Sequence, residues 1–506
     1  MTIVSQLAPL RAHPGARRTQ GLDDATIARL APSQPALVAA IAAAADEYAR
    51  IHDELGSFTS ESGQPLLDLD EDAQLQLIQA GLLNFYPADA VNPYIALAAR
   101  GPWIVTLKGA VLYDTGGYGM LGFGHAPETV IQAMGRPQVM ANVMTPNLAQ
   151  LRFERALRKE IGHTRGACPY PQFMCLNSGS ESVTLAARIV DTHAKSMTDS
   201  GGRHAGRTIK RLVVKGSFHG RTERPALYSD SSRKNYLQYL ASYREEDSVL
   251  AVAPYDEAAL RQAFADADAN GWFIEAMFLE PVMGEGDPGR SLPPRYYALA
   301  RELTHAHGAL LLIDSIQAGL RAHGVLSVVD YPGFEQLTPP DMETYSKALN
   351  AGQYPLSVLA LSERAAGIYQ RGTYGNTMSA NPRALEVACA VMAQITPQLR
   401  ANIRARGAEV TGKLEALGSE LGGLIRKVQG TGLLFSCELD SSFKGYGADS
   451  SEQWLREQGL GVIHGGENSL RFTPVFDIDE AGVDLNVAMV KRALLEGPRQ
   501  KQAAAA

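Results

Sequence analysis

The sequence predicts an α/β fold in which a large domain with a mostly parallel central sheet precedes a smaller α+β domain. The unbroken apolar run Ala309–Ile313 is typical of a strand buried on both faces, as in parallel sheets. Between residues 173 and 361, strand-like runs alternate with helical segments, and this order implies right-handed crossovers and parallel neighbours. After residue 381, helices come first and strand-like runs follow, which indicates an α+β domain.

The chain has 506 residues, of which 45% are hydrophobic, and this is enough for a large core and more than one domain. We predict three parts. They are an N-terminal arm and helical extension (1–100), a large domain with the candidate site (101–380), and a small C-terminal α+β domain with a disordered tail (381–506).

Composition argues against several classes of function. The net charge of −7 argues against a nucleic-acid-binding surface. The four cysteines show no ligand-like clustering, so we expect a reduced, cytoplasmic setting and not a disulfide framework. No stretch is apolar enough for a transmembrane helix, and the N-terminus lacks the charged-then-apolar order of a signal peptide. We therefore expect no membrane partner.

The N-terminal part predicts an arm, two helices and a hairpin. Residues Met1–Gly21 are rich in Arg, Pro and Gln, and they predict a mobile arm. Ala-rich sequence and apolar spacing predict helices over 35–55 and 71–83. The segment 103–113 holds two short β-like runs around a Lys-Gly pair, which is typical of a hairpin.

Five glycines lie between Asp114 and His125. They exclude a regular element and let the backbone approach a ligand or another chain. Tyr118 lies among them. It is either a packed aromatic residue or the wall of a substrate pocket, and the sequence leaves both interpretations open.

A strand-like run over 173–177 is followed by Gly179, Ser180 and a helical segment. Such a turn presents free backbone N–H groups, a hydroxyl and the positive end of the helix dipole, so it is a candidate phosphate site. The alternative is an ordinary helix N-cap by Ser178 or Ser180.

The next strand-like runs lead into loops with further candidate side chains. The run over 211–215 leads into Phe218 and His219, and a planar cofactor packs against an aromatic ring. The run over 276–280 leads into a Gly-rich loop that contains Glu285. A helix is expected over 294–307 with a stop at Gly308, and a further strand over 356–361.

The central strand ends on Asp314, at the edge of the sheet where open α/β proteins bind ligands. A carboxylate there is costly without a cationic partner, and a protonated pyridine nitrogen is such a partner. Lys347 lies in the next loop region. An aspartate for the pyridinium and a lysine for a Schiff base are the two groups that a pyridoxal 5'-phosphate (PLP) enzyme needs. The alternative is a helix-capping aspartate and a solvated lysine.

The C-terminal segment predicts helices over 381–395, 400–417 and 484–495, and strands over 433–439, 461–464 and 469–476. Arg471 alternates with Leu470 and Phe472, so its side chain faces away from theirs. It is either a solvated strand arginine or a bidentate carboxylate clamp.

Eight separated motifs occur in the order GFGHAPETVIQAM, NSGSES, SFHGRT, EPVMGEG, DSIQAG, SKALNAGQYPLS, GNTMSANP and LRFTPVF. In these motifs, from about Pro102 to about Leu495, the chain resembles the class III (ω-amino acid/ornithine-type) PLP-dependent aminotransferases. The resemblance implies PLP fold type I, the aspartate aminotransferase-like fold. It also implies transfer of an amino group between an amino acid or ω-amino compound and a 2-oxo acid through a Schiff base at Lys347.

The resemblance assigns roles around the cofactor ring. Lys347 forms the Schiff base, and Asp314 keeps the pyridine nitrogen protonated. Phe218 and Ile316 pack on the two faces of the ring, and Gln317 contacts the phenolic oxygen.

The remaining roles concern the phosphate and the substrate. Gly179 and Ser180 bind the phosphate, and His219 belongs to the cofactor-binding loop. Thr377 adds a hydroxyl from the second subunit, which implies a homodimer with shared sites. Glu285 and Arg471 form a switchable ion pair that admits a carboxylate or an amine, and Tyr118 contacts the substrate.

Four positions depart from the family pattern. Ser315 replaces the Glu that usually follows the aspartate, Met283 replaces a Gln, Met378 replaces an aromatic residue, and Arg321 stands one place early. Ser315, Arg321 and Met283 keep open an alternative PLP reaction, namely racemisation, decarboxylation or intramolecular amino transfer. The implied partners are an amino donor and a 2-oxo acid. The scattered histidines show no ligand pattern, so we expect no metal site.

Overall fold

The computed structural model describes residues 2–244 and 247–500. These residues group by their internal contacts into two compact units. Unit 1 comprises the chain up to Pro127, residues 405–429 and the chain from Phe435 onward; unit 2 comprises Glu128–Arg404 and Gly430–Leu434. The division into domains at residues 100 and 380 stays a prediction, and each unit is described by itself.

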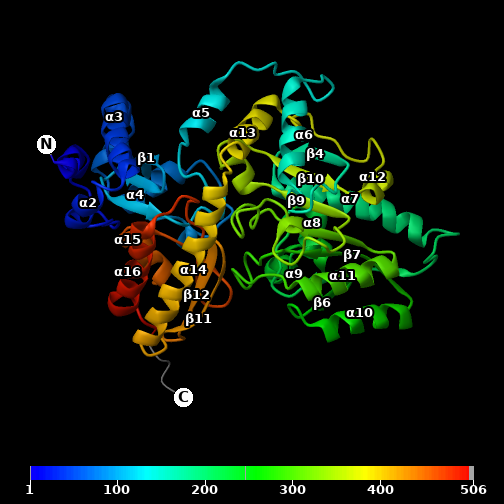
Figure 1. Cartoon of the computed structure of the whole chain (residues 1–506). Helices are drawn as coiled ribbons and strands as arrows, with labels where there is room; N and C mark the ends of the chain where they lie inside the picture. The colour runs from blue at the N-terminus through cyan, green and yellow to red at the C-terminus, as the bar shows by residue number, and fades with distance from the viewer. Residues whose placement is uncertain (1, 245–246, 501–506) are drawn as a thin grey trace. The chain divides into compact units, whose positions relative to one another are not determined.

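Unit 2 is built on a seven-stranded sheet with the order β4-β10-β9-β8-β7-β5-β6 (Figure 1). Its strands are β4 (Gln172–Leu176), β5 (Thr208–Val214), β6 (Val249–Val252), β7 (Trp272–Leu279), β8 (Leu310–Asp314), β9 (Met342–Tyr345) and β10 (Ser357–Leu361). Strands β5 to β9 pair in parallel, which confirms the predicted mostly parallel sheet. Strand β10 is antiparallel to both β9 and β4, since no helical crossover separates it from β9.

Helices surround this sheet. They are α5 (Glu128–Gly135), α6 (Leu148–Glu160), α7 (Gly179–Thr198), α8 (Glu223–Tyr228), α9 (Arg233–Tyr239), α10 (Glu257–Ala269), α11 (Pro294–His307), α12 (Glu363–Ile368) and α13 (Pro382–Met392). Helix α7 packs on β7, β9 and β10, and its buried Val183 and Ile189 share a core with Leu310 and Leu312 of β8. Each such side chain contributes about 1.5–3 kcal/mol by leaving water. Helix α11 ends at Gly308 as predicted.

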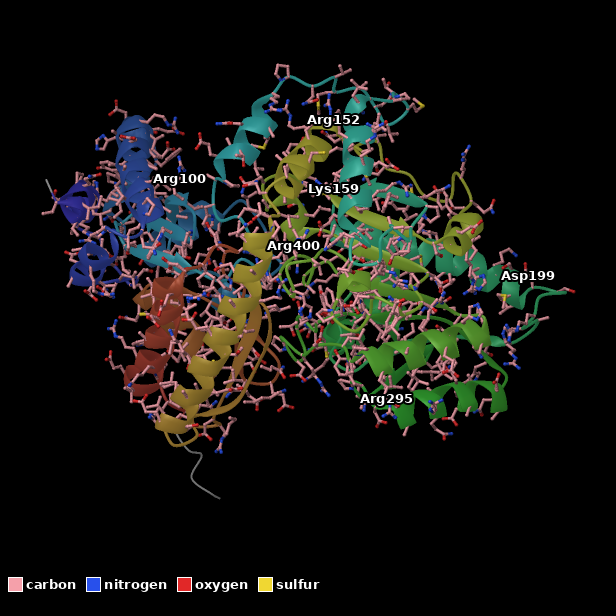
Figure 2. All side chains as sticks on the ribbon, in the orientation of Figure 1. Arg100, Arg152, Lys159, Asp199, Arg295 and Arg400 are labelled. Atoms are coloured by element: carbon pink, nitrogen blue, oxygen red, sulfur yellow. The ribbon has the colours of Figure 1, made fainter. Side chains whose placement is uncertain are left out.

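Helices α6 and α13 pack against each other at one end of unit 2. Arg152 of α6, labelled in Figure 2, forms an ion pair with the nearly buried Glu386 of α13. Helix α6 starts with a capping box in which Asn147 and Gln150 bond each other's backbone N–H groups. Helix α14 (Pro397–Glu420) follows α13 and runs across the boundary between the units.

Unit 1 contains most of the remaining elements. One sheet has the order β1-β2-β3-β13, with β1 (Ala96–Arg100), β2 (Trp103–Thr106), β3 (Val111–Asp114) and β13 (Leu460–Gly461). A second has the order β11-β12-β15-β14, with β11 (Ile425–Thr431), β12 (Leu434–Leu439), β14 (Ile463–Gly465) and β15 (Ser469–Phe472). The helices are α1 (Ala8–Arg11), α2 (Asp24–Leu30), α3 (Pro35–Ser57), α4 (Glu71–Gln79), α15 (Ser451–Gln458) and α16 (Glu480–Glu496). The predicted hairpin is present as the antiparallel pair β2–β3.

The prediction of a mobile N-terminal arm is wrong for the described residues. Leu7 and Leu10 are buried, and the Thr19 N–H donates to Glu71 Oε2 at 2.7 Å. The Gln20 N–H donates to the Glu457 carbonyl oxygen at 2.8 Å. Buried leucines and backbone hydrogen bonds hold the arm in place despite its polar composition. The composition could not reveal this, because the acceptors lie in segments distant in sequence. Of the predicted disordered tail, residues 501–506 lie outside the described residues.

Two features are absent from the described residues. None of their helices is both long and apolar enough to cross a membrane. No group of three or more His, Cys, Asp or Glu side chains in 2–244 or 247–500 is arranged to hold a metal ion.

The packing of the arm predicts its contribution to stability. Replacing the fully buried Leu7 by Ala leaves a cavity and lowers the free energy of unfolding by about 2–5 kcal/mol. Denaturant unfolding measures this change. The fully exposed Leu83 provides the control, since Leu83→Ala leaves the free energy of unfolding unchanged. An unchanged value for Leu7→Ala would mean that the arm detaches in solution.

Candidate active site

Two predicted residues lie at one edge of the unit 2 sheet. Strands β8 and β9 are parallel, with Asp314 opposite Thr344, and the Ser315 N–H donates to the Thr344 carbonyl oxygen at 3.0 Å. Asp314 is the last residue of β8, and Lys347 follows β9 by two residues. Since the carboxyl ends of parallel strands meet at one edge, both residues belong to the edge where α/β proteins bind ligands.

The Asp314 carboxylate is almost completely buried, with 5% of the residue exposed. Its Oδ2 lies 2.9 Å from Nδ1 of the buried His219, and its Oδ1 accepts the Ile316 N–H at 3.1 Å. The His219 N–H in turn donates to Ser229 Oγ at 2.9 Å. The His219 ring and the loop that follows β8 therefore orient the Asp314 carboxylate, and solvent does not.

Lys347 has an unusual backbone conformation. Its φ of 46° lies in the left-handed region, which costs a non-glycine residue about 1–2 kcal/mol. The surrounding turn is fixed because Ser346 Oγ and Asn350 Nδ2 both donate to the Leu356 carbonyl oxygen, at 2.7 and 2.9 Å. The side chain is half-buried, so it is not the solvated lysine of the alternative interpretation. Strain of this kind clusters at functional sites.

Helix α7 begins beside this edge. Ser178 is its N-cap, and Ser178 Oγ accepts the Glu181 N–H at 3.2 Å, as the capping interpretation predicts. Ser182 Oγ hydrogen-bonds Thr344 Oγ1, which ties the first turn of α7 to the end of β9. Gly179 and Ser180 occupy the first turn, whose N–H groups have no partner within the helix.

Close contacts bring the candidate loops together. A Cβ at Gly179 would lie 2.7 Å from Ile316 Cδ1, and one at Gly284 would lie 1.8 Å from Gln317 Oε1. A side chain at either glycine would have to displace the end of the Ile316 or Gln317 side chain. The start of α7 and the loop after β7 therefore both touch the loop that follows Asp314.

Glu280 joins two of these loops and was missed as a functional residue by the sequence analysis. Its Oε1 accepts the Phe218 N–H at 3.0 Å and its Oε2 accepts the Gly284 N–H at 2.8 Å. Burial, reinforced by the nearby Asp314, raises the pKa of the Glu280 carboxyl to about 7, against a lowering effect of His219. An acid directly after a buried apolar run was the signal available in the sequence.

The other candidates of unit 2 are less enclosed. The Arg221 guanidinium lies 5.5 Å from the centre of the half-buried Phe218 ring. Ser231 Oγ is 3.5 Å from Glu285 Oε2. Thr377 is exposed, next to Asn376, whose Nδ2 donates to Glu181 Oε1 at 2.8 Å.

Tyr118 and Arg471 lie together in unit 1. The Arg471 guanidinium lies 5.3 Å from the centre of the Tyr118 ring, a cation–π contact. Arg471 is buried, which excludes the solvated arginine of the alternative interpretation. Tyr118 has a φ of 52° and stacks on Tyr86 at 6.1 Å, and burial raises the pKa of the Tyr118 phenol. Glu285, the predicted ion-pair partner of Arg471, belongs to unit 2.

The residues at the sheet edge fit PLP. Asp314 offers a buried anion to a pyridinium, Lys347 an amine to an aldehyde, and the start of α7 a set of N–H groups to a phosphate. His219 Nε2 is buried and has no hydrogen-bond partner among the described residues, so this ring offers one unused polar atom.

A family model decides the identity of the chain. Residues 85–494 match the model of the aminotransferase class-III family, which is more than half of the chain. The chain belongs to the class III aminotransferases. It is therefore a PLP-dependent aminotransferase, and the alternative PLP reactions find no support in the comparisons.

Relatives with known names agree with this family. The chain is 30% identical over 329 residues to an acetylornithine aminotransferase from Xanthomonas axonopodis, over 64% of this chain and 74% of the relative. It is 27% identical to one from Neisseria meningitidis, over 81% of this chain and 96% of the relative.

Solved structures of an ornithine and an N-acetylornithine aminotransferase share the fold. Ornithine aminotransferase from Toxoplasma gondii superposes with a TM-score of 0.72 at 22% identity, over 88% of this chain and 98% of that one. N-acetylornithine aminotransferase from Stenotrophomonas maltophilia gives 0.64 at 22% identity, over 83% and 98%. These similarities confirm fold type I for this class III aminotransferase.

The raised pKa of Glu280 predicts a pH dependence of stability. The pKa of the Glu280 carboxyl is about 7 in the folded protein, against an ordinary value of 4.5 in the unfolded chain. Between pH 4.5 and about pH 7 the carboxyl therefore takes up a proton when the protein folds. Its contribution to stability is complete below about pH 4.5 and is lost as the pH rises to about 7, a change of up to about 3 kcal/mol.

Glu280→Gln removes this contribution. The free energy of unfolding of the cofactor-free protein, measured at several pH values in denaturant, then falls less steeply between about pH 5 and pH 7 than in the wild type. Identical slopes for the two proteins would contradict the raised pKa.

Proposed function

We propose that this aminotransferase moves the terminal amino group of an ω-amino donor, of the ornithine or N-acetylornithine type, to a 2-oxo acid. The observation that supports this most is the buried Asp314 carboxylate at the same sheet edge as Lys347. The printed activities of the relatives, acetylornithine and ornithine aminotransferases, point to the donor class.

Two residues perform the central chemistry in this proposal. PLP, when bound, supplies a cationic ring that accepts the electron pair of the substrate carbon. Asp314 Oδ atoms stabilise the positive charge of the ring nitrogen, and because they are already oriented by His219 and Ile316 N–H, no reorganisation is needed. Lys347 Nζ removes the proton from the substrate carbon as the general base.

The remaining unit 2 candidates orient the cofactor. Phe218 and Ile316 pack on the ring faces, His219 orients Asp314, and Gln317 bonds the phenolic oxygen. Gly179 and Ser180 bind the phosphate at the first turn of α7. The close approach of Ile316 to Gly179 supports this arrangement, because it brings a ring-packing residue next to the phosphate site.

In unit 1, Arg471 and Tyr118 recognise the substrate. A buried guanidinium, stacked on an aromatic ring, is suited to a carboxylate of the 2-oxo acid or of the donor. The ion pair of Glu285 with Arg471 that the family resemblance implies stays a prediction, since the two residues belong to different units.

We also propose a homodimer in which Thr377 adds a hydroxyl to the phosphate site of the partner. Exposed apolar side chains support it, because patches of this kind mark interfaces. They gather in the α5–α6 connection, an irregular loop in Figure 1, at the start of α6, and beside Thr377. They include Val139, Met144, Leu148 and Met378.

We also propose a cytoplasmic location. The four free cysteines support it, because disulfides are rare in the reducing cytoplasm.

The first experiment follows the visible absorbance of the protein with bound PLP while candidate donors are added without a 2-oxo acid. Ornithine or N-acetylornithine is expected to convert the cofactor band to that of the amine form and to release an aldehyde product, since the first half-reaction needs no acceptor. An amino acid that racemises or loses CO₂ while the band persists would contradict the proposal.

Lys347→Ala serves as the control for this experiment. It removes both the Schiff base and the base for proton transfer, so turnover falls by several orders of magnitude. Full activity in this variant would refute the assignment of Lys347.

Replacement of Arg471 separates the two kinds of substrate. Arg471→Ala removes charge-assisted hydrogen bonds to a carboxylate, and the KM of a 2-oxo acid is expected to rise by about 10- to 100-fold. Steady-state kinetics with a simple amine that lacks a carboxylate gives the comparison, and its KM changes little. Equal losses for both substrates would mean that Arg471 is structural.

A further inference from the structure

Strand β9 contains an acidic residue that none of the roles above uses. Glu343 is fully buried, and so are its neighbours Met342, Thr344 and Tyr345. A carboxyl group in such a strand is costly unless polar partners replace the water that it loses. The buried Glu343 carboxyl is therefore stable only where polar partners surround it.

The Glu343 carboxylate accepts four hydrogen bonds from neutral donors. Oε1 accepts from Ser315 Oγ at 2.6 Å and from the Val328 N–H at 2.8 Å. Oε2 accepts from Ser327 Oγ at 2.6 Å and from Tyr170 OH at 2.8 Å. Burial raises the pKa of this carboxyl, and these donors oppose the increase.

Three of the four donors belong to the two ends of one loop. Ser315 is the first residue after β8, and Ser327 and Val328 are about a dozen residues further along the chain. Between these ends the loop carries Ile316 and Gln317, which the proposed function places against the cofactor ring. One carboxylate thus joins the beginning and the end of the segment that positions both side chains.

Glu343 acts from the side of the sheet opposite the candidate site. It pairs with Ile313, whereas Asp314 pairs with Thr344, and successive strand residues point to opposite faces. Thr344 bonds Ser182 of α7, so the Asp314 side is the α7 side. Glu343 does not touch the cofactor in this arrangement and can influence it only through the loop.

The middle of the same loop is fixed by other groups. Arg321 Nη1 donates to the Leu433 carbonyl oxygen at 3.1 Å, and the Leu433 N–H donates back to the Arg321 carbonyl oxygen at 2.9 Å. Arg400, labelled in Figure 2, donates to the Gly324 carbonyl oxygen. Loss of the Glu343 bonds is therefore expected to loosen the ends of the loop and to leave its middle in place.

The sequence gives an independent reason to pair these residues. The family resemblance in the sequence implies an acidic residue directly after the aspartate, and this chain has Ser315 there. The structure supplies a carboxylate at that serine from the neighbouring strand. We propose that Glu343 and Ser315 together are positioning residues that fix the loop carrying Ile316 and Gln317, with Glu343 in place of the missing acid. This inference rests on the proposed function.

The test uses the PLP-loaded protein and the variants Glu343→Gln and Ser315→Ala. Hydrogen exchange is expected to become on the order of tenfold faster at amides 316–318 and 327–329, and to stay unchanged at 320–325. The Kd of PLP is expected to rise on the order of tenfold, because a buried hydrogen-bond partner is lost. The KM of the amino donor stays unchanged. Ser315→Ala removes a single hydroxyl, so the test remains valid even where Glu343→Gln fails to fold.

Glu275 provides the matched control. It is a fully buried acid of β7, which is separated from β9 by β8 in the sheet, and it is paired with Arg211, Arg224 and Tyr228. Glu275→Gln is expected to lower the melting temperature without changing the loop exchange or the Kd of PLP. This separates positioning of the loop from a general loss of stability.

A reciprocal exchange tests the pairing directly. Ser315→Glu alone places two carboxylates in contact and is expected to weaken PLP binding, whereas Ser315→Glu combined with Glu343→Ser restores it. Variants that lose only melting temperature, with wild-type loop exchange and PLP affinity, would overturn the positioning role and leave the proposed function intact. A wild-type protein that binds PLP but transfers no amino group would instead contradict the proposed function alone.

Discussion

The burial of one carboxylate at the end of a central strand is the constraint on which the site depends. Asp314 follows four apolar residues of β8 and is almost inaccessible to water. Such a group is stable only where its charge is compensated, and the chain supplies an imidazole and a backbone N–H. In the proposed function a cationic ring completes this compensation, so the energetic requirement of the buried carboxylate and the chemistry of an aminotransferase coincide.

The same principle explains why the loops at this edge are ordered. Carboxylates at the ends of β7 and in β9 accept N–H and O–H groups from loops, and each bond both satisfies the acid and fixes a loop. Glu181 likewise accepts hydrogen bonds from Asn376, in the turn beside Thr377, and from the Asn177 N–H. These acids therefore accept the hydrogen bonds that solvent would accept in a mobile loop. The order of each loop then depends on every one of these bonds.

Local patterns in the sequence predicted the elements but not the pairings between them. The apolar run before Asp314, the β2–β3 hairpin and the end of α11 at Gly308 follow from neighbouring residues, and the structure has all three. The burial of Leu7 and the contact of His219 with Asp314 depend on residues far away in the chain, and composition carries no signal for them. Glu280 and Glu343 are intermediate cases, because an acid in or after a buried run is visible, while its partners are not.

Two consecutive residues of β9 form hydrogen bonds on opposite faces of the sheet. Thr344 bonds Ser182 of α7 beside the candidate site, and Glu343 bonds Ser315 on the opposite face of the sheet. A slip of one residue in the pairing of β9 would exchange these two faces, placing the acid in the α7 core and the threonine among the loop hydroxyls. The strand therefore tolerates no insertion or deletion between β8 and Lys347 that changes its register, and the spacing of METYSK is as constrained as its composition.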